Sequence, residues 1–182
     1  PSLQSPNKLF FSVLCAASLM NLFKRQRDAV GLSLFSNKVN LHTHEKTSIK
    51  HHKFLLYELQ NILNQEPLMK TSRLIEALHQ IAENIHKRSL VILFSDMFDN
   101  SYDNEKLFSA LHHLKFNKHE VILFHVMDNT KEIEFKYENR PYKFIDMETG
   151  DELKLSPNEV RKEYQNQSQE FLKKLKNRCL KY

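Results

Sequence analysis

A continuous apolar segment, Leu90 to Phe94, is the feature that most constrains the fold of this chain. It is rich in branched residues, shows no polar alternation and is closed by Ser95 and Asp96. Such a run is typical of a strand that is buried on both faces, inside a parallel sheet covered by helices. Because ligands of open α/β sheets bind outside the carboxyl ends of the strands, Asp96 is the strongest candidate for a functional residue.

The rest of the chain alternates between helical and strand patterns. Apolar residues at helical spacing predict helices at 7–26, 49–64, 71–85, 104–116 and 157–178. Strand patterns occur at 29–35, 39–43, 88–96 and 119–128. Gly31 inside the first strand indicates close approach by a neighbouring element. This alternation predicts a largely parallel sheet with helices on both sides.

The pattern changes after Asp128. Three segments alternate with period two: 132–137, 142–146 and 152–155. With a turn at Thr149-Gly150-Asp151, they predict an antiparallel β ribbon inserted at 130–156, followed by a helix from Pro157. The predicted fold is therefore α/β, a Rossmann-like three-layer sandwich with a mostly parallel sheet and a small ribbon, in one domain over residues 1–182.

Composition excludes several classes of protein. The chain contains only 2 glycines, with neither GxGxxG nor a Walker-type loop, which argues against a dinucleotide or P-loop site. Its cysteines, Cys15 and Cys179, form no CxxC pattern, which suits a reducing compartment and predicts a cytoplasmic protein. The most apolar stretch, 9–23, falls short of the about 18–20 apolar residues that span a bilayer and lacks signal-peptide features.

The formal net charge is +5, which permits an anionic partner without requiring one. Basic residues gather at the C-terminus: Lys173, Lys174, Lys176, Arg178 and Lys181. They complement the negative end of a helix dipole, which is the favoured interpretation. Binding of an anionic polymer by this basic helix is the alternative. No zinc-finger spacing or aromatic and basic RNA-binding motif supports nucleic-acid recognition.

Five segments together form a family pattern: 25–32 (RQRDAVGL), 88–96 (RSLVILFSD), 119–128 (HEVILFHVMD), 144–150 (FIDMETG) and 160–164 (VRKEY). This pattern resembles the bacterial family called domain of unknown function 58, which is similar to von Willebrand factor type A domains. The resemblance covers nearly the whole chain. It implies a von Willebrand factor A-like sandwich with a metal-ion-dependent adhesion site.

In type A domains that site combines an Asp-x-Ser-x-Ser loop, a Thr from a second loop and an Asp at a later strand end. By the resemblance, Thr71 matches the second part and Asp96 the third, so both are candidate Mg²⁺ ligands. Hydroxyl and carboxylate oxygens are hard ligands that suit Mg²⁺. Lys70 departs from the pattern, because it adds a positive charge beside the cation.

The Asp-x-Ser-x-Ser loop is absent from this chain. In the family the first strand and that loop precede the first helix, so we expect them upstream of Pro1, and the family's last strand after Tyr182. With two of its three parts present, the site is incomplete in this chain.

The resemblance implies a non-catalytic protein-interaction domain that is Mg²⁺-dependent and binds an acidic residue of its partner. The implied partner is a MoxR-type AAA+ ATPase, in complex assembly or a chaperone-like activity. This pairing is an association at the level of the family. The alternative from another class is a metal-assisted phosphate-ester hydrolase with Asp96, Asp99 and Asp128 as ligands.

Each candidate ligand also has a structural interpretation. Thr71 is placed to cap its helix, and Asp96 and Asp128 are placed to accept backbone N–H bonds in the turns that follow their strands. Asp99 and Asp103 are expected to be solvated loop acids.

The 10 histidines suggest a transition-metal site, but no recognised zinc spacing joins His42, His44, His51 and His52. We expect His112-His113 to be solvated on the outer half of their helix. His125 lies inside a strand pattern and is expected to be a satisfied core histidine.

Overall fold

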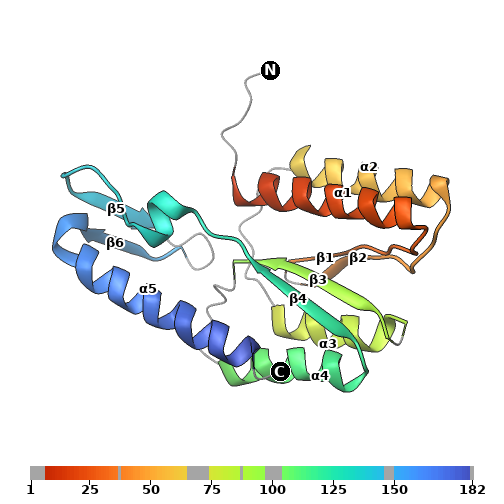
Figure 1. The fold of residues 1–182 in the computed structure, drawn as a ribbon. Coiled ribbons are helices and arrows are strands. Elements are labelled where there is room, and N and C mark those ends of the chain that lie inside the picture. Colours follow the sequence, from red (N-terminus) through yellow and green to blue (C-terminus); the bar gives the residue numbers. More distant parts are fainter. Residues whose placement is uncertain are drawn as a thin grey trace. The chain divides into compact units, whose positions relative to one another are not determined.

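The computed structural model describes residues 7–36, 38–64, 74–86, 88–96, 104–145 and 150–180 (Figure 1). In chain order its elements are α1 Lys8–Gln26, β1 Ser33–Phe35, β2 Val39–His42, α2 Ile49–Asn64, α3 Leu74–Asn84, β3 Leu90–Ser95, α4 Asn104–Phe116, β4 Glu120–His125, the π-helix η1 Asn129–Ile133, β5 Tyr142–Ile145, β6 Glu152–Leu155 and α5 Pro157–Cys179.

The protein is a mixed α/β structure, as the alternating patterns predict. Its described strands form three two-stranded sheets: β3–β4 is parallel, and β1–β2 and β5–β6 are antiparallel. The complete three-layer sandwich around one mostly parallel sheet is not confirmed by these strands. Contacts divide the chain into two compact units, one ending at Val126 and the other beginning at Met127.

Helix α1 begins and ends with local backbone signals. The Asn7 side chain accepts a hydrogen bond from Phe10 N–H at 2.7 Å, which caps the start of the helix. At the end, Arg27 adopts a left-handed φ of 64°, and its N–H bonds to Lys24 O. The buried side of α1 packs on α2 through four core residues: Val13, Met20, Leu55 and Leu59.

The strand predicted at 29–35 is shorter than expected. β1 covers only Ser33–Phe35 and pairs antiparallel with β2, with a register irregularity between Leu34 and Phe35. The close approach predicted at Gly31 is confirmed, because a Cβ there would lie 2.7 Å from the Thr43 carbonyl oxygen. Glycine is needed at this position for space.

β3 and β4 form the parallel pair, in register from Leu90↔Glu120 to Ser95↔His125. One face carries Leu93, which is buried. On the opposite face the rings of Phe94 and Phe124 stack at 4.9 Å between centroids. Phe124 is nevertheless 42% exposed. The prediction that this strand pair is buried on both faces is therefore wrong for the described structure.

Helices α3 and α4 pack against each other and carry some of the most completely buried side chains of the first unit. Leu78, Ala110 and Leu114 are at most 1% exposed. A side-chain bond from Asn117 Nδ2 to Ala82 O at 2.9 Å ties the end of α4 to α3. These contacts fix the two helices relative to each other.

The second unit contains η1, the β5–β6 hairpin and α5. The hairpin confirms two of the three predicted ribbon strands, and Gly150 between them has a φ of 78°. The prediction of a third strand at 132–137 is wrong. That segment begins in η1 and then turns at Phe135, whose φ of 48° is incompatible with a strand. The period-two pattern instead reflects aromatic packing, since Phe135 and Phe144 stack at 6.0 Å.

α5 begins at Pro157, as the sequence predicts. Its last turn carries Lys176 and Arg178, where cations complement the helix dipole. Within the described ranges, none of the helices combines the length and the apolar character that crossing a membrane requires.

Candidate functional site

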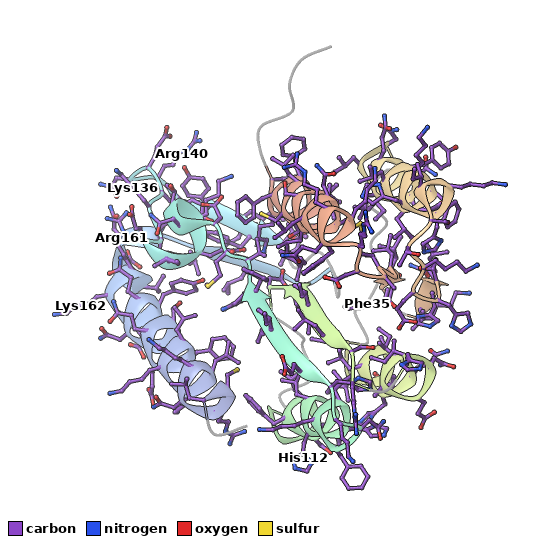
Figure 2. The ribbon with its side chains drawn as sticks, turned by 45° about the vertical axis from the view of Figure 1, so that its right-hand side comes forward. Phe35, His112, Lys136, Arg140, Arg161 and Lys162 are labelled. Atoms are coloured by element: carbon purple, nitrogen blue, oxygen red, sulfur yellow. The ribbon has the colours of Figure 1, made fainter. Side chains whose placement is uncertain are left out.

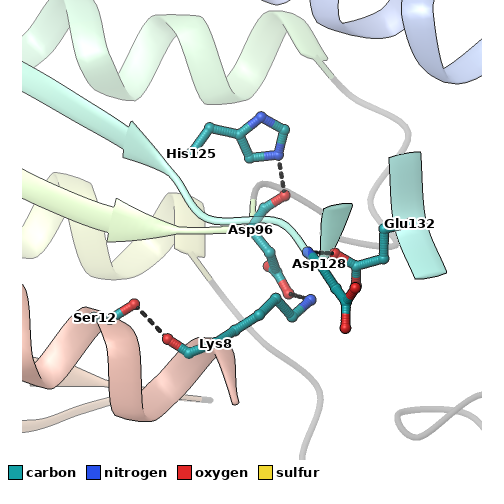
Figure 3. A network of polar contacts seen from close by, with 6 residues as sticks. All are labelled: Lys8, Ser12, Asp96, His125, Asp128 and Glu132. Carbon is teal, nitrogen blue, oxygen red and sulfur yellow. Dashed lines mark hydrogen bonds and ion pairs between the residues drawn. The ribbon is translucent and has the colours of Figure 1, made fainter. Parts of the chain in front are cut away.

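Asp96 directly follows β3, at the carboxyl end of the parallel strand pair. Its carboxylate Oδ2 lies 3.0 Å from Lys8 Nζ, in the first turn of α1 (Figure 3). The Lys8 and Asp96 side chains are 34% and 42% exposed. Water therefore reaches the pair, and its net contribution to stability is at most about 1 kcal/mol.

His125 fixes the backbone that carries Asp96. Its Nε2 lies 2.6 Å from the Asp96 carbonyl oxygen, and because a carbonyl can only accept, the imidazole donates from Nε2 (Figure 3). Ser95 O also accepts from Val126 N–H at 2.9 Å, which extends the ladder by one bond. The prediction that His125 is satisfied is confirmed, but the residue is half-buried and does not lie in the core. Its function here is to hold the exit of β3 against β4.

Lys8 is the residue that the sequence interpretation missed. It lies 88 positions before Asp96, so no local pattern joins the two. A weak signal existed, because Lys8 is the one charged residue of α1 before Lys24 and stands where the helix dipole disfavours a cation. An unfavourable lysine at that end is explained by a carboxylate elsewhere in the fold.

Thr71, Lys70, Asp99 and Asp103 lie outside the described residues, so their predicted roles stay predictions. Asp96 is thus the one predicted Mg²⁺ ligand whose surroundings are known. Its Oδ2 already faces an ammonium group. Among the described residues, Lys8 is the group that supplies positive charge at the Asp96 carboxylate, and the Mg²⁺ role of Asp96 stays a prediction.

Asp128 belongs to the second unit and acts as a helix cap. Its Oδ1 accepts from Thr130 N–H and Lys131 N–H, both at 2.9 Å. In return, the Asp128 N–H donates to Glu132 Oε2 at 2.8 Å, which completes a reciprocal cap of η1 (Figure 3). These bonds match the structural interpretation of Asp128 as a turn acid.

Two of the histidines near β1 and β2 hydrogen-bond to other residues of the first unit. His42 Nδ1 lies 2.9 Å from Ser33 Oγ, and His51 Nε2 lies 3.1 Å from Val30 O. Among the residues whose placement is described, no three His, Cys, Asp or Glu side chains converge as a metal-binding group. His113 departs from its prediction: it is half-buried and faces His79, whereas His112 is exposed (Figure 2).

The fold and the site together define a class: a mixed α/β domain with a reachable carboxylate at the end of a parallel strand. A family model described as "Protein of unknown function DUF58" matches residues 4–173. The chain belongs to this family. Neither a curated protein nor a solved structure matches it significantly.

Proposed function

We propose that this chain is a non-catalytic protein-interaction domain whose contact surface centres on Asp96 and Lys8. The observation that carries the proposal is the Asp96 carboxylate at the carboxyl end of β3, 42% exposed and paired with a lysine. Ligands of α/β sheets bind at that edge. A carboxylate paired with an ammonium group offers both signs of charge to the side chains of a partner.

The surroundings of Lys8 support a protein partner. The next residues of α1 are apolar and open to solvent: Leu9 is 46% and Phe11 is 54% exposed. Protein interfaces combine such apolar contacts with a few charged groups that set register and orientation. A partner that presents an acidic and a basic side chain could exchange them for the Lys8–Asp96 pair at little cost, since the pair is solvated.

The finer form of the proposal names a MoxR-type AAA+ ATPase as the partner and a von Willebrand factor A-like sandwich as the complete fold. It also places Mg²⁺ between Asp96, Thr71 and the partner. In that form the ion would share the Asp96 carboxylate with the Lys8 ammonium group, which lies 3.0 Å from Oδ2. Mg²⁺ would supply a hard, octahedral centre that accepts a partner's carboxylate.

No observation favours a second function. The hydrolase alternative uses Asp96, Asp99 and Asp128, and the Asp128 carboxylate caps η1. In the basic C-terminal helix, Lys174 pairs with Glu170 at 2.7 Å, which reduces the charge offered to an anionic polymer. The hydrolase alternative is tested together with the proposal.

The test is the affinity of the purified chain for the MoxR-type ATPase of the same organism, measured by calorimetry with Mg²⁺ and again with EDTA. We expect Asp96→Asn to weaken binding about tenfold or more, because it removes the charge at the contact centre. Asp28→Asn, an exposed acid of the same unit, is the matched control. Unchanged affinity of Asp96→Asn would contradict the proposal.

Two further arms separate the alternatives. If EDTA abolishes binding, and Asp96→Asn abolishes it in the presence of Mg²⁺, the Mg²⁺-dependent form is supported. If the unsubstituted chain still binds in EDTA, the metal-free form is supported. Hydrolysis of a generic phosphate ester with Mg²⁺ or Mn²⁺, abolished by Asp96→Asn, would replace the binding-only proposal with the hydrolase.

A further inference from the structure

Two histidines from different helices face each other in the first unit. The Nδ1 atoms of His79 on α3 and His113 on α4 lie 3.0 Å apart, and the ring centroids are 5.3 Å apart at an interplanar angle of 42°. Both side chains are half-buried, so solvent still reaches the rings. One ring donates from Nδ1 and the other accepts there.

The backbone under this histidine pair is held by the helix core. Leu78 precedes His79 and is 1% exposed, while Leu114 follows His113 and is 0% exposed. Because each histidine is next to a fully buried leucine, its Cα position is determined by α3–α4 packing. The two nitrogens therefore meet through a rigid scaffold and not through flexible loops.

The separation of the two nitrogens suits a metal ion with a preference for imidazole. Zinc–nitrogen bonds of about 2.0–2.1 Å at a tetrahedral angle hold the two nitrogens about 3.3 Å apart, close to the present 3.0 Å. Each ring also has to turn by about 35°, so that its Nδ1 lone pair points at the ion and no longer at the other nitrogen. Nitrogen ligands select zinc, copper or nickel, whereas Mg²⁺ prefers oxygen. Water can fill the remaining positions on the exposed side.

We propose that His79 and His113 form a two-histidine site for a Zn²⁺-type transition-metal ion that links α3 to α4. The ion replaces the shared hydrogen bond with two metal–nitrogen bonds. Its remaining coordination positions face solvent. This proposal is independent of the Asp96 surface, because it uses different residues, a different class of donor atom and a different class of ion.

The experiment titrates Zn²⁺ into the full chain without an affinity tag, by calorimetry and by thermal unfolding. We expect Zn²⁺ to raise the melting temperature, since it binds the folded state. His79→Gln and His113→Gln should each weaken Zn²⁺ binding about tenfold or more and remove most of the shift. His112 is an exposed neighbour of His113 on the same helix (Figure 2), so His112→Gln is the matched control. This variant should keep the Zn²⁺ affinity and the rise in melting temperature.

A second measurement avoids substitution. Electron paramagnetic resonance of the unsubstituted chain with one equivalent of Cu²⁺ should show coupling to two imidazole nitrogens. Equal Zn²⁺ affinity in all three variants, or equal losses in all three, would overturn the proposal. So would a Cu²⁺ spectrum with a single imidazole nitrogen. Mg²⁺ should produce no shift that depends on either histidine.

Discussion

His119 is the residue where burial most clearly determines a response to pH. It lies just before β4, is 4% exposed and accepts a hydrogen bond at Nδ1 from Ser89 N–H at 3.2 Å. Its Nε2 has no hydrogen-bond partner among the described residues. Burial lowers the pKa of His119 from its ordinary value of 6.5, and the negative charge of Glu45 opposes this effect only in part.

The lowered pKa predicts that acid destabilises the protein through this ring. At pH values below 6.5 the unfolded chain binds a proton at His119 that the folded chain binds only at still lower pH. The free energy of unfolding is therefore expected to fall as the pH drops below 6.5. His119→Asn keeps an acceptor but does not titrate, and it should flatten this slope by up to about 1 kcal/mol per pH unit.

Urea denaturation at a series of pH values measures that slope. His112→Asn, on the exposed side of α4, is the matched histidine substitution for comparison. If His119→Asn retained the full pH slope of the unsubstituted chain, burial of His119 would not be its cause.

At the scale of elements, one arginine holds α5 against the segment after η1. Arg161 Nε donates to Phe135 O and its Nη2 donates to Tyr137 O, each at 3.1 Å. Beside these bonds, the rings of Phe135 and Tyr164 lie 4.3 Å apart between centroids. The planar guanidinium reaches both carbonyls at once, which a lysine ammonium does less well.

Arg161→Ala is expected to destabilise the second unit by about 2–3 kcal/mol, because two carbonyl oxygens lose a charged donor in a half-buried position. The adjacent Lys162 is exposed, and Lys162→Ala should change the free energy by less than about 0.5 kcal/mol (Figure 2). Near-ultraviolet circular dichroism during urea unfolding reports on the packed tyrosines. Equal effects of the two substitutions would show that the Arg161 bonds contribute nothing.

At the scale of the whole molecule, the two units differ in the depth of their cores. In the first unit, Leu78 and Leu114 are at most 1% exposed on packed helices. In the second, Pro157 is less than 2% exposed, while the larger side chains of Phe135 and Leu175 each remain 8% exposed. Local opening costs less free energy where fewer apolar contacts are lost.

We therefore expect backbone amides of α5 and the β5–β6 hairpin to exchange with deuterium about tenfold faster, or more, than those of α3 and α4. Hydrogen-exchange mass spectrometry of the full chain measures both units in one sample. Equal protection in the two units would mean that they open as one cooperative body.

Local sequence patterns were sufficient to predict a helix, strand or close approach that depends on residues near it in the chain. The apolar run at Leu90 predicts β3, Pro157 predicts the start of α5, and Gly31 predicts a close backbone approach. Period two failed at 132–137, because alternating aromatic residues can pack around a turn as well as along a strand.

The sequence by itself therefore determined most of the helices, the β3 strand and the family, since periodicity and turn chemistry act between residues close in the chain. Only the tertiary structure paired Lys8 with Asp96 across 88 positions and His79 with His113 across 34. It also decided that Phe124 stays exposed and that Asp128 caps η1. Each of these facts depends on which surfaces meet after the elements have formed, and local periodicity does not encode that choice.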